Sequence, residues 1–376
     1  MIIREIRAVN FRNIAGAELG FSGSFNFISG KNAQGKTSLL EAIHIFSLGR
    51  SFRTSKVAEM ITFGEDYFYL KLSCESDTGI CLDIELSLEQ GGRIRAKVNG
   101  DRQPGVSSII GLIPSVIFTP GDVELSSGPP AVRRLFADYT AAQVSPEFLV
   151  DLKEFRRILA QRNSLLRKIS LGEGGAEELE AWNSAFVEKG ASVARGRREI
   201  LSGLAEKAAG IYDEIRGGER FGLDYRCSFG DRERELEESL AAALVRVSGS
   251  EKRRGYSLAG PQYDDIVLTL DDVDLRKYGS QGRRRLAAIV MKLAQAGTIM
   301  EKRAERPVVL LDDIFSELDG ETSAGVRGLL SSGYQSFITS PRKEQLDTAG
   351  SGALELVVER GVFKGVGVSA NGEERG

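Results

Sequence analysis

Histidine and cysteine are scarce in this chain, and their scarcity excludes several chemistries. The 376 residues contain a single histidine, His44, and three cysteines. A zinc site built on several imidazoles and a Ser-His-Asp triad are both excluded, and we expect His44 to serve packing or capping. The cysteines, at positions 74, 81 and 227, have neither the number of a disulfide framework nor the spacing of a metal-ligand cluster. We therefore expect a reduced protein without histidine-based catalysis.

Long apolar runs and a surplus of one charge are also missing. No run is long enough to span a bilayer, and residues 1–5 show no signal-peptide pattern. We therefore expect a cytoplasmic protein that makes no membrane contact. Lys and Arg number 50 against 53 Asp and Glu, which gives a net charge of −3. Because the chain is not a polycation, any nucleic-acid binding must rest on local basic patches.

The pattern of apolar residues changes twice along the chain. Up to residue 122 it predicts mostly strands, at 67–72, 80–88 and 93–98, separated by turns that contain glycine. Residues 123–257 repeat apolar side chains at helical spacing, with glycine-rich breaks. Strands and helices alternate again afterwards. The simplest interpretation is an α/β domain built from both chain ends, 1–122 and 258–376, with a mainly helical lobe, 123–257, inserted between them.

Residues 30–37 match the phosphate-loop pattern G-x-x-x-x-G-K-[ST] without a mismatch. An apolar run at 25–28 predicts a strand before this loop, and residues 37–48 predict a helix after it, ended by Gly49. In that order, glycines let backbone N–H groups turn toward phosphate oxygens, and the start of the helix adds partial positive charge. We expect Lys36 to reach the β- and γ-phosphates of ATP, and the Thr37 hydroxyl to bind Mg²⁺. The predicted ATP-binding residues of the loop are Gly30, Lys31, Asn32, Ala33, Gln34, Gly35, Lys36 and Thr37.

Two acids, Asp312 and Asp313, directly follow a short apolar strand predicted at 307–311. In phosphate-loop NTPases, an acid at the end of a neighbouring buried strand holds Mg²⁺ opposite the loop hydroxyl, and Asp312 fits that role. Asp313, one residue further, is placed to orient or deprotonate the attacking water. Lys36, Asp312 and Asp313 are therefore the predicted catalytic residues, and Thr37 and Asp312 are the predicted metal ligands.

Two further motifs complete a characteristic order. Ser280, Gln281 and Gly282 precede a helix predicted at 283–300, where backbone N–H groups favour an anion. A segment of the form S-x-L-D, at 316–319, follows the acid pair. The order of these features is that of ABC-type ATPase heads. A phosphate loop comes first, followed by a long insertion, a Ser-x-Gly helix, an acidic strand end and S-x-L-D. We therefore predict an α/β fold of that type, with a phosphate-loop core, an antiparallel β subdomain and the inserted helical lobe.

The chain resembles the RecF family of bacterial DNA replication and repair proteins, short relatives of the SMC-type ATPases. The resemblance covers nearly the whole chain, and LGRSFR at 48–53 is its most specific motif. Other matching motifs are NFRN at 10–13, FTPGD at 118–122, RRLFAD at 133–138 and YGSQG at 278–282. The chain departs from the family pattern at Gln262 and Tyr263, which stand where His-Arg is usual, and at Arg283, which stands where Gln is frequent.

The resemblance implies an ATP-dependent homodimer that holds ATP between two copies of the chain. Ser280, Gln281 and Gly282 of one copy would contact the nucleotide bound at Lys36 of the other. The resemblance further implies binding to single-stranded, gapped or junction DNA, cooperation with RecR and RecO, and promotion of RecA loading. It also implies a weak ATPase, whose slow hydrolysis serves as a release step.

Basic pairs in the helical lobe are the candidate DNA contacts, and they are Arg133, Arg134, Arg156 and Arg157. Arginine suits phosphate because its planar guanidinium binds two oxygens at once. No zinc finger and no stacking platform of interleaved aromatic residues is visible in the sequence, so we expect sequence-tolerant, salt-sensitive binding. Two other functions remain open, namely a phosphate-loop enzyme of another class, such as a small-molecule kinase, and a structural SMC-like head.

Overall fold

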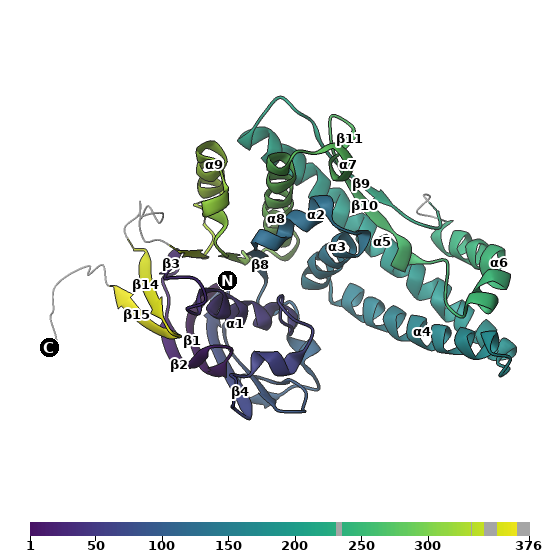
Figure 1. Cartoon of the computed structure of the whole chain (residues 1–376), viewed down its shortest axis with the longest axis horizontal. Helices are drawn as coiled ribbons and strands as arrows, with labels where there is room; N and C mark the ends of the chain where they lie inside the picture. The colour runs from purple at the N-terminus through teal and green to yellow at the C-terminus, as the bar shows by residue number, and fades with distance from the viewer. Residues whose placement is uncertain (231–234, 332, 342–351, 367–376) are drawn as a thin grey trace. The chain divides into compact units, whose positions relative to one another are not determined.

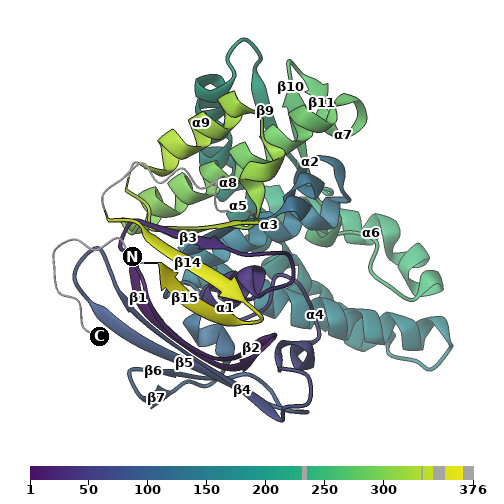
Figure 2. The same cartoon turned by 60° about the vertical axis from the view of Figure 1, so that its left-hand side comes forward.

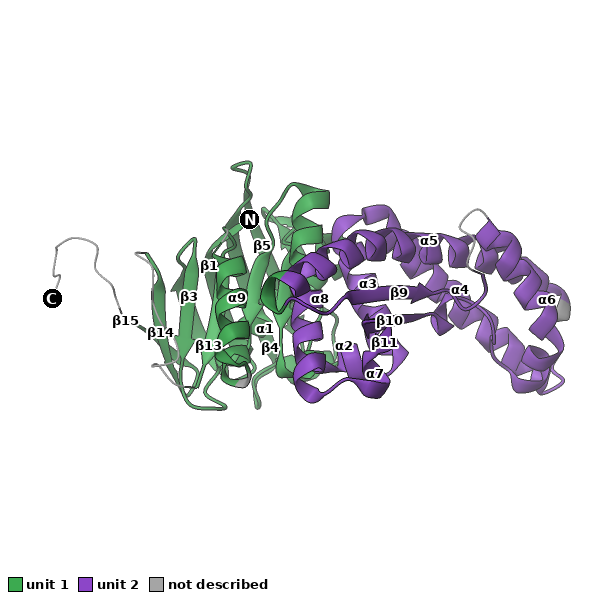
Figure 3. Cartoon of the chain, turned by 90° about the horizontal axis from the view of Figure 1, so that it is seen from above, with its two compact units in different colours: residues 1–122, 214–216, 295–376 green, residues 123–213, 217–294 purple. Residues whose placement is uncertain are grey.

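The computed structural model describes residues 1–230, 235–331, 333–341 and 352–366. Contacts divide the chain into two units, which Figure 3 distinguishes by colour. Unit 1 comprises Met1–Asp122, Glu214–Arg216 and Gln295–Gly376, and unit 2 comprises Val123–Asp213 and Gly217–Ala294. Within the described residues, no helix is long and apolar enough to cross a membrane.

One sheet of unit 1 is antiparallel, with the strand order β2-β1-β4-β5-β6-β7 (Figure 2). Its strands are β1 (Ile2–Phe11), β2 (Ile14–Gly20), β4 (Tyr67–Glu75), β5 (Cys81–Glu89), β6 (Arg95–Val98) and β7 (Asp101–Arg102). Along β4, every second side chain is buried, at Phe68, Leu70, Leu72 and Cys74, and the side chains between them are not. This period of two places one face of the sheet in the core.

The other sheet of unit 1 has the order β15-β14-β3-β13-β12-β8 (Figure 1). Its strands are β3 (Phe25–Ser29), β8 (Ser115–Phe118), β12 (Val308–Leu311), β13 (Ser336–Ser340), β14 (Leu354–Glu359) and β15 (Val362–Val366). All neighbours from β14 to β8 pair in parallel, whereas β15 pairs with β14 antiparallel. β8, β12 and β13 are buried along their whole length, as expected of parallel strands that are covered on both faces.

Helix α1 (Lys36–Leu48) is part of the core of unit 1, and every residue of it except Thr37 is buried. It contacts β1 and β4 of the antiparallel sheet and β8 and β13 of the parallel one. His44 lies within it, with Nδ1 2.8 Å from the Ser115 hydroxyl, which is the packing role expected of it. The helix ends at Gly49, whose left-handed backbone (φ 65°) lies so close to Val106 that a Cβ would stand 2.8 Å from its Cγ2. The helix that carries the phosphate-loop lysine is therefore firmly anchored.

Unit 2 is mainly helical, with one small sheet of order β11-β10-β9. Its helices are α2 (Glu124–Ser127), α3 (Pro130–Val144), α4 (Pro146–Ser170), α5 (Ala176–Ile215), α6 (Leu236–Arg254), α7 (Leu275–Tyr278) and the first part of α8 (Gln281–Arg303). Its strands are β9 (Phe221–Arg226), β10 (Asp265–Leu270) and β11 (Val273–Asp274). Unit 1 has one further helix among its described residues, α9 (Gly320–Leu330). Short 3-10 helices are η1 (Val57–Met60), η2 (Val106–Ile109), η3 (Pro120–Val123), η5 (Pro261–Tyr263) and η6 (Ile314–Glu317).

The second boundary predicted from the sequence, at 257/258, differs from the division into units. β9 falls inside the predicted lobe and β10 falls beyond it, yet the two strands pair over six positions, from Asp265 opposite Arg226 to Leu270 opposite Phe221. This pairing keeps 258–294 in unit 2, and the inserted unit contains a sheet as well as helices. The first boundary falls at Asp122, the residue at which the apolar pattern changes.

Candidate nucleotide-binding site

The predicted phosphate loop connects the end of β3 to the start of α1. Close packing explains the first of its glycines, and backbone conformation explains the second. A Cβ at Gly30 would lie 2.5 Å from the Val358 carbonyl oxygen, and Gly35 has a φ of 121°, which L side chains rarely adopt. Any other residue at either position would displace the loop from β14 or strain its backbone.

Lys36 points back into this loop and is only 4% exposed. Its Nζ donates to the Gly30 carbonyl at 2.7 Å and to the Lys31 carbonyl at 3.4 Å, and it lies 3.8 Å from Oδ2 of Asp313. The ammonium group is therefore held on the concave side of the loop, where a phosphate would lie. The side chain needs no large rearrangement there to meet an anion.

Thr37 and the two acids meet because strands β3, β13 and β12 are parallel neighbours whose carboxyl ends lie at one edge of the sheet. The Thr37 hydroxyl lies 2.9 Å from both carboxylate oxygens of Asp312. On β13, the Thr339 hydroxyl accepts from the Asp313 N–H at 2.9 Å and lies 3.0 Å from Oδ1 of Asp312. The left-handed backbone of Asp313 (φ 51°) turns the chain sharply after β12. Thr339 thus fixes the two acids relative to each other.

The oxygens of Thr37 and Asp312 form a suitable site for Mg²⁺. This ion prefers hard oxygen ligands and commonly binds through one or two protein groups together with substrate phosphates. Burial raises the pKa of the Asp312 carboxyl, while hydrogen bonds from Thr37 and Thr339 and the charge of Lys36 act in the opposite direction. A divalent cation beside this carboxylate would favour its ionised form. The two predicted ligands therefore fit the metal.

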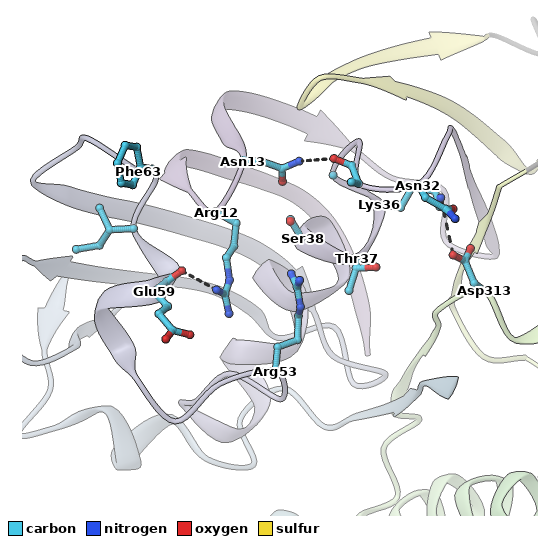
Figure 4. Close-up of a pocket in the computed structure, with 13 residues that line it drawn as sticks. Arg12, Asn13, Asn32, Lys36, Thr37, Ser38, Arg53, Glu59, Phe63 and Asp313 are labelled. Carbon is cyan, nitrogen blue, oxygen red and sulfur yellow. Dashed lines mark hydrogen bonds and ion pairs between the residues drawn. The ribbon is translucent and has the colours of Figure 1, made fainter. Parts of the chain in front are cut away.

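A pocket of about 580 Å³ opens in front of the loop (Figure 4). Lys36, Thr37 and Asp313 lie at one end of the pocket and Phe63 at the other, and Ile61 also lines it. The phenyl ring of Phe63 is fully exposed at this second end. A phosphate chain at the lysine end would place the rest of a nucleotide toward the apolar end.

Two arginines, Arg12 and Arg53, line the same pocket from different parts of the chain (Figure 4). Both pair with Glu41, a fully buried carboxylate on α1, at 2.6 Å for Arg12 and 3.2 Å for Arg53. The Ser51 hydroxyl donates to the same carboxylate at 2.5 Å. Glu41 therefore ties the segment around residues 51–53 to the helix that follows the phosphate loop. The sequence analysis assigned no role to Arg12, Glu41 or Arg53.

Ser280, Gln281 and Gly282 belong to unit 2 and are all exposed at the beginning of α8. The N–H of Arg283 donates to the Ser280 hydroxyl at 3.4 Å, and the Arg283 guanidinium pairs with Glu219. No side chain or backbone atom lies within 4 Å of a Cβ added at Gly282. The motif is therefore accessible, and its contact with a nucleotide on a second copy remains a prediction.

The four predicted DNA-contacting arginines differ in their environments. Arg133 is buried, pairs with Asp265 at 2.8 Å and donates to the Gly128 carbonyl, so the prediction is wrong for this residue. Arg134 donates to the Asp264 carbonyl at 2.7 Å, and the exposed Arg156 pairs with Asp138 at 3.0 Å. Arg157 is exposed, with its guanidinium carbon 5.7 Å from the centre of a Trp182 ring. Arg134, Arg156 and Arg157 remain predicted contacts.

Comparison with known proteins relates these features to a family. A family model described as the RecF/RecN/SMC N terminal domain matches residues 2–362. A DNA replication and repair protein RecF of Ruminiclostridium cellulolyticum is 34% identical over 354 residues, which cover 92% of this chain and 94% of the relative. The chain belongs to the RecF family. The RecF protein of Bacillus mycoides is 35% identical, again over 92% of this chain and 94% of its own length.

Solved structures agree with this assignment. A structure described as the recombination mediator protein RecF-ATP in the RecFOR pathway matches with a TM-score of 0.90 and 32% identity, over 97% of this chain and 98% of that one. An Smc head bound to the C-winged helix domain of ScpA matches with a TM-score of 0.59 and 16% identity, over 98% of both chains, which shows a shared fold. The predicted ABC-type ATPase head of this RecF-family chain is confirmed.

Two hairpin turns hold the phosphate loop of this RecF-family protein from outside. Two backbone N–H groups in the turn between β14 and β15 donate to Gln34. The Gly361 N–H donates to the Gln34 carbonyl at 2.8 Å, and the Arg360 N–H donates to the Gln34 side-chain oxygen at 2.5 Å. From the turn between β1 and β2, the Asn13 amide donates to the Ala33 carbonyl at 3.2 Å. Neither contact involves a residue near the loop in sequence. Together they fix the part of the loop where N–H groups must face phosphate oxygens.

Gly361→Ala should therefore weaken ATP binding by about tenfold, the effect of losing one or two hydrogen bonds. A Cβ at Gly361 would lie 2.0 Å from the Asn13 carbonyl oxygen, so the turn must withdraw from both Asn13 and Gln34. Gly365→Ala is the matched control, because a Cβ at that site of the same hairpin meets nothing within 4 Å. Titration with a fluorescent ATP analogue would compare the two variants. Equal affinities would mean that the hairpin does not position the loop.

Proposed function

We propose that this chain is an ATP-dependent DNA-binding protein of recombinational repair and replication restart. The observation that carries the proposal is the convergence of Lys36, Thr37 and Asp313 at one end of the pocket, with Asp312 2.9 Å from the Thr37 hydroxyl. The likeness to a RecF protein whose structure is described as ATP-bound supports it. Such a protein would act on DNA in the cytoplasm.

Each residue of the site would have a separate role in ATP binding and hydrolysis. Loop N–H groups and Lys36 bind the phosphates, and Thr37 with Asp312 holds Mg²⁺, which would neutralise charge on the phosphate oxygens. Asp313 lies 3.8 Å from Lys36 at the pocket wall and would orient or deprotonate the attacking water. As the resemblance to the RecF family implies, hydrolysis would be slow and would serve to release the protein from DNA.

Dimerisation would complete the site. The exposed Ser280, Gln281 and Gly282 of one copy would cover the nucleotide bound at Lys36 of the second, so that the dimer forms only with ATP. The preferred DNA would be single-stranded, gapped or at a junction with duplex, and the protein would act with RecR and RecO to promote RecA loading. The similar solved protein is described as a recombination mediator in the RecFOR pathway, and this description supports the proposed partners.

A DNA-binding assay tests the proposal. Fluorescent gapped, duplex and single-stranded oligonucleotides would be titrated with the protein, with and without ATP and Mg²⁺, at about 50 and 200 mM salt. We expect ATP to tighten binding, gapped DNA to bind better than plain duplex, and the affinity to fall by about tenfold or more at the higher salt. Binding that ignores both ATP and salt would contradict the proposed function.

A further inference from the structure

Two helices of unit 2 end beside each other and bring together basic residues that are far apart in sequence. Arg167 and Lys168 lie in the last turn of α4, and Lys252, Arg253 and Arg254 lie in the last turn of α6. The glycine that ends α6 packs on α4, since a Cβ at Gly255 would lie 3.3 Å from the Cα of Arg167. All five basic side chains are exposed. We call these five residues the basic end of unit 2.

The charges of the basic end are not neutralised. Among the residues that the structure describes, none of the five forms an ion pair, and the one side-chain partner is the Ser250 hydroxyl, 3.2 Å from Arg253. Some other exposed cations of unit 2 have carboxylate partners, for example Arg156 with Asp138 and Arg195 with Glu237. The basic end therefore retains the free cationic groups that an external anion requires.

The acid that α6 carries beside these cations is turned inward. Glu251 is 1% exposed and pairs at 2.6 Å with Arg162, which is also 1% exposed. The same carboxylate accepts from the Leu258 N–H at 2.7 Å, and Arg162 also donates to the Ser257 hydroxyl. This buried network leaves the surface charge positive and gives the basic end a rigid base. Glu173, in the turn after α4, forms no ion pair with the five among the described contacts.

Two tyrosines stand next to the basic end. Tyr256 follows the glycine that ends α6 and is 44% exposed, and Tyr263 is 46% exposed. The Tyr263 hydroxyl donates to the Ser257 carbonyl at 2.7 Å, which fixes that ring on the buried network. The negative ends of the helix dipoles account for some cations at these positions. They do not account for two exposed aromatic rings beside them.

We propose that the basic end, with Tyr256 and Tyr263, binds single-stranded DNA. Five cations would contact backbone phosphates, and the rings would stack on bases, a combination typical of sequence-tolerant single-strand binding. An acidic protein segment would use the cations but has no planar bases to stack on the rings, which is why we favour DNA. The inference rests on the proposed function only in that DNA is the ligand; it names a surface distinct from the nucleotide pocket.

The test compares variants of the full chain for binding to fluorescein-labelled oligo-dT at low salt. R253E/R254E should lower the affinity by about tenfold or more and reduce its salt dependence. Tyr256→Ala should lower it by about fivefold or more, and Tyr256→Phe should restore it, because phenylalanine keeps the stacking face. Arg195→Ala, which removes a cation that already has a carboxylate partner, is the matched control and should bind as the wild type does. Melting temperature and ATP affinity should not change in any of them.

The outcomes separate this inference from the proposed function. If the wild type binds oligo-dT and R253E/R254E binds equally well, the basic end is not the site, while the proposed function stands. If Tyr256→Ala has no effect, or if poly-glutamate competes as well as an oligonucleotide of equal charge, the surface does not bind single-stranded DNA as proposed. If the wild type binds no DNA with or without ATP, the proposed function itself is wrong.

Discussion

Lys36→Ala is expected to lower the affinity for ATP by about 100-fold or more. The variant loses a buried cation that would donate to two phosphate groups, and a hydrogen bond between charged groups contributes about 1.5–3 kcal/mol. It also loses the bonds from Nζ to the Gly30 and Lys31 carbonyls that shape the loop. Titration with a fluorescent ATP analogue, checked by calorimetry, would measure the loss.

Lys31→Ala is the matched control for this experiment. Lys31 lies in the same loop and carries the same charge, but its side chain is exposed. It would contribute its backbone N–H group, which alanine retains, so we expect its ATP affinity to stay within about threefold of the wild type, the range of a surface change. Equal losses in the two variants would show that the loop binds phosphate through general positive charge and not through the buried lysine.

Most of the fold follows from local sequence signals. The period-two pattern of residues 67–72 predicts β4. The glycine-flanked segments predict β3 and α1, and the apolar run before Asp312 predicts β12, all close to their observed bounds. What could not be predicted is which distant segments pair. β9 and β10 are separated by α6 along the chain, and nothing local in either strand specifies its partner. The predicted second boundary differs from the division into units for this reason.

The site shows the same division between local and distant information. Lys36, Thr37 and the acid pair belong to motifs whose spacing is fixed by chemistry, and the structure brings them together. Thr339, Glu41 and Gly361 act through contacts across the sheet and between hairpins. The sequence around each of them therefore carries little signal of its role. Glu41 offers one, because a carboxylate within an otherwise apolar helix must find a partner.

Arg133 shows a signal that could have been used. It precedes Phe136, Ala137 and Thr140 at helical spacing, and all four lie on the buried face of α3. The sequence presents Arg133 and Arg134 as one basic cluster, although neighbours on a helix point in different directions. The two tyrosines of the basic end illustrate the reverse case. Six residues lie between them in the sequence, and the structure is needed to place both beside the ends of α4 and α6.

Asp313→Asn is expected to stop ATP hydrolysis and to leave ATP binding nearly intact, so that an ATP-bound dimer persists. Asp313 does not contact Thr37, and its carboxylate lies 3.2 Å from the Thr339 hydroxyl and 3.8 Å from Lys36. Asparagine fits the same space and can keep a hydrogen bond to Thr339, but it cannot accept a proton from water. Loss of general-base assistance lowers a rate by about 10²–10⁴-fold. Phosphate release would measure hydrolysis, and light scattering coupled to size exclusion would measure the dimer.

Asp312→Asn serves as the contrasting variant, because it changes the neighbouring carboxylate that is predicted to hold the metal. It should weaken Mg²⁺-dependent ATP binding and therefore form no stable dimer, although it also stops hydrolysis. The two variants thus distinguish a residue that acts on water from one that holds the ion. If Asp313→Asn binds ATP and stays monomeric, the nucleotide does not join two copies of this chain. If it hydrolyses ATP at the wild-type rate, another group activates the water, and the role predicted for Asp313 is wrong.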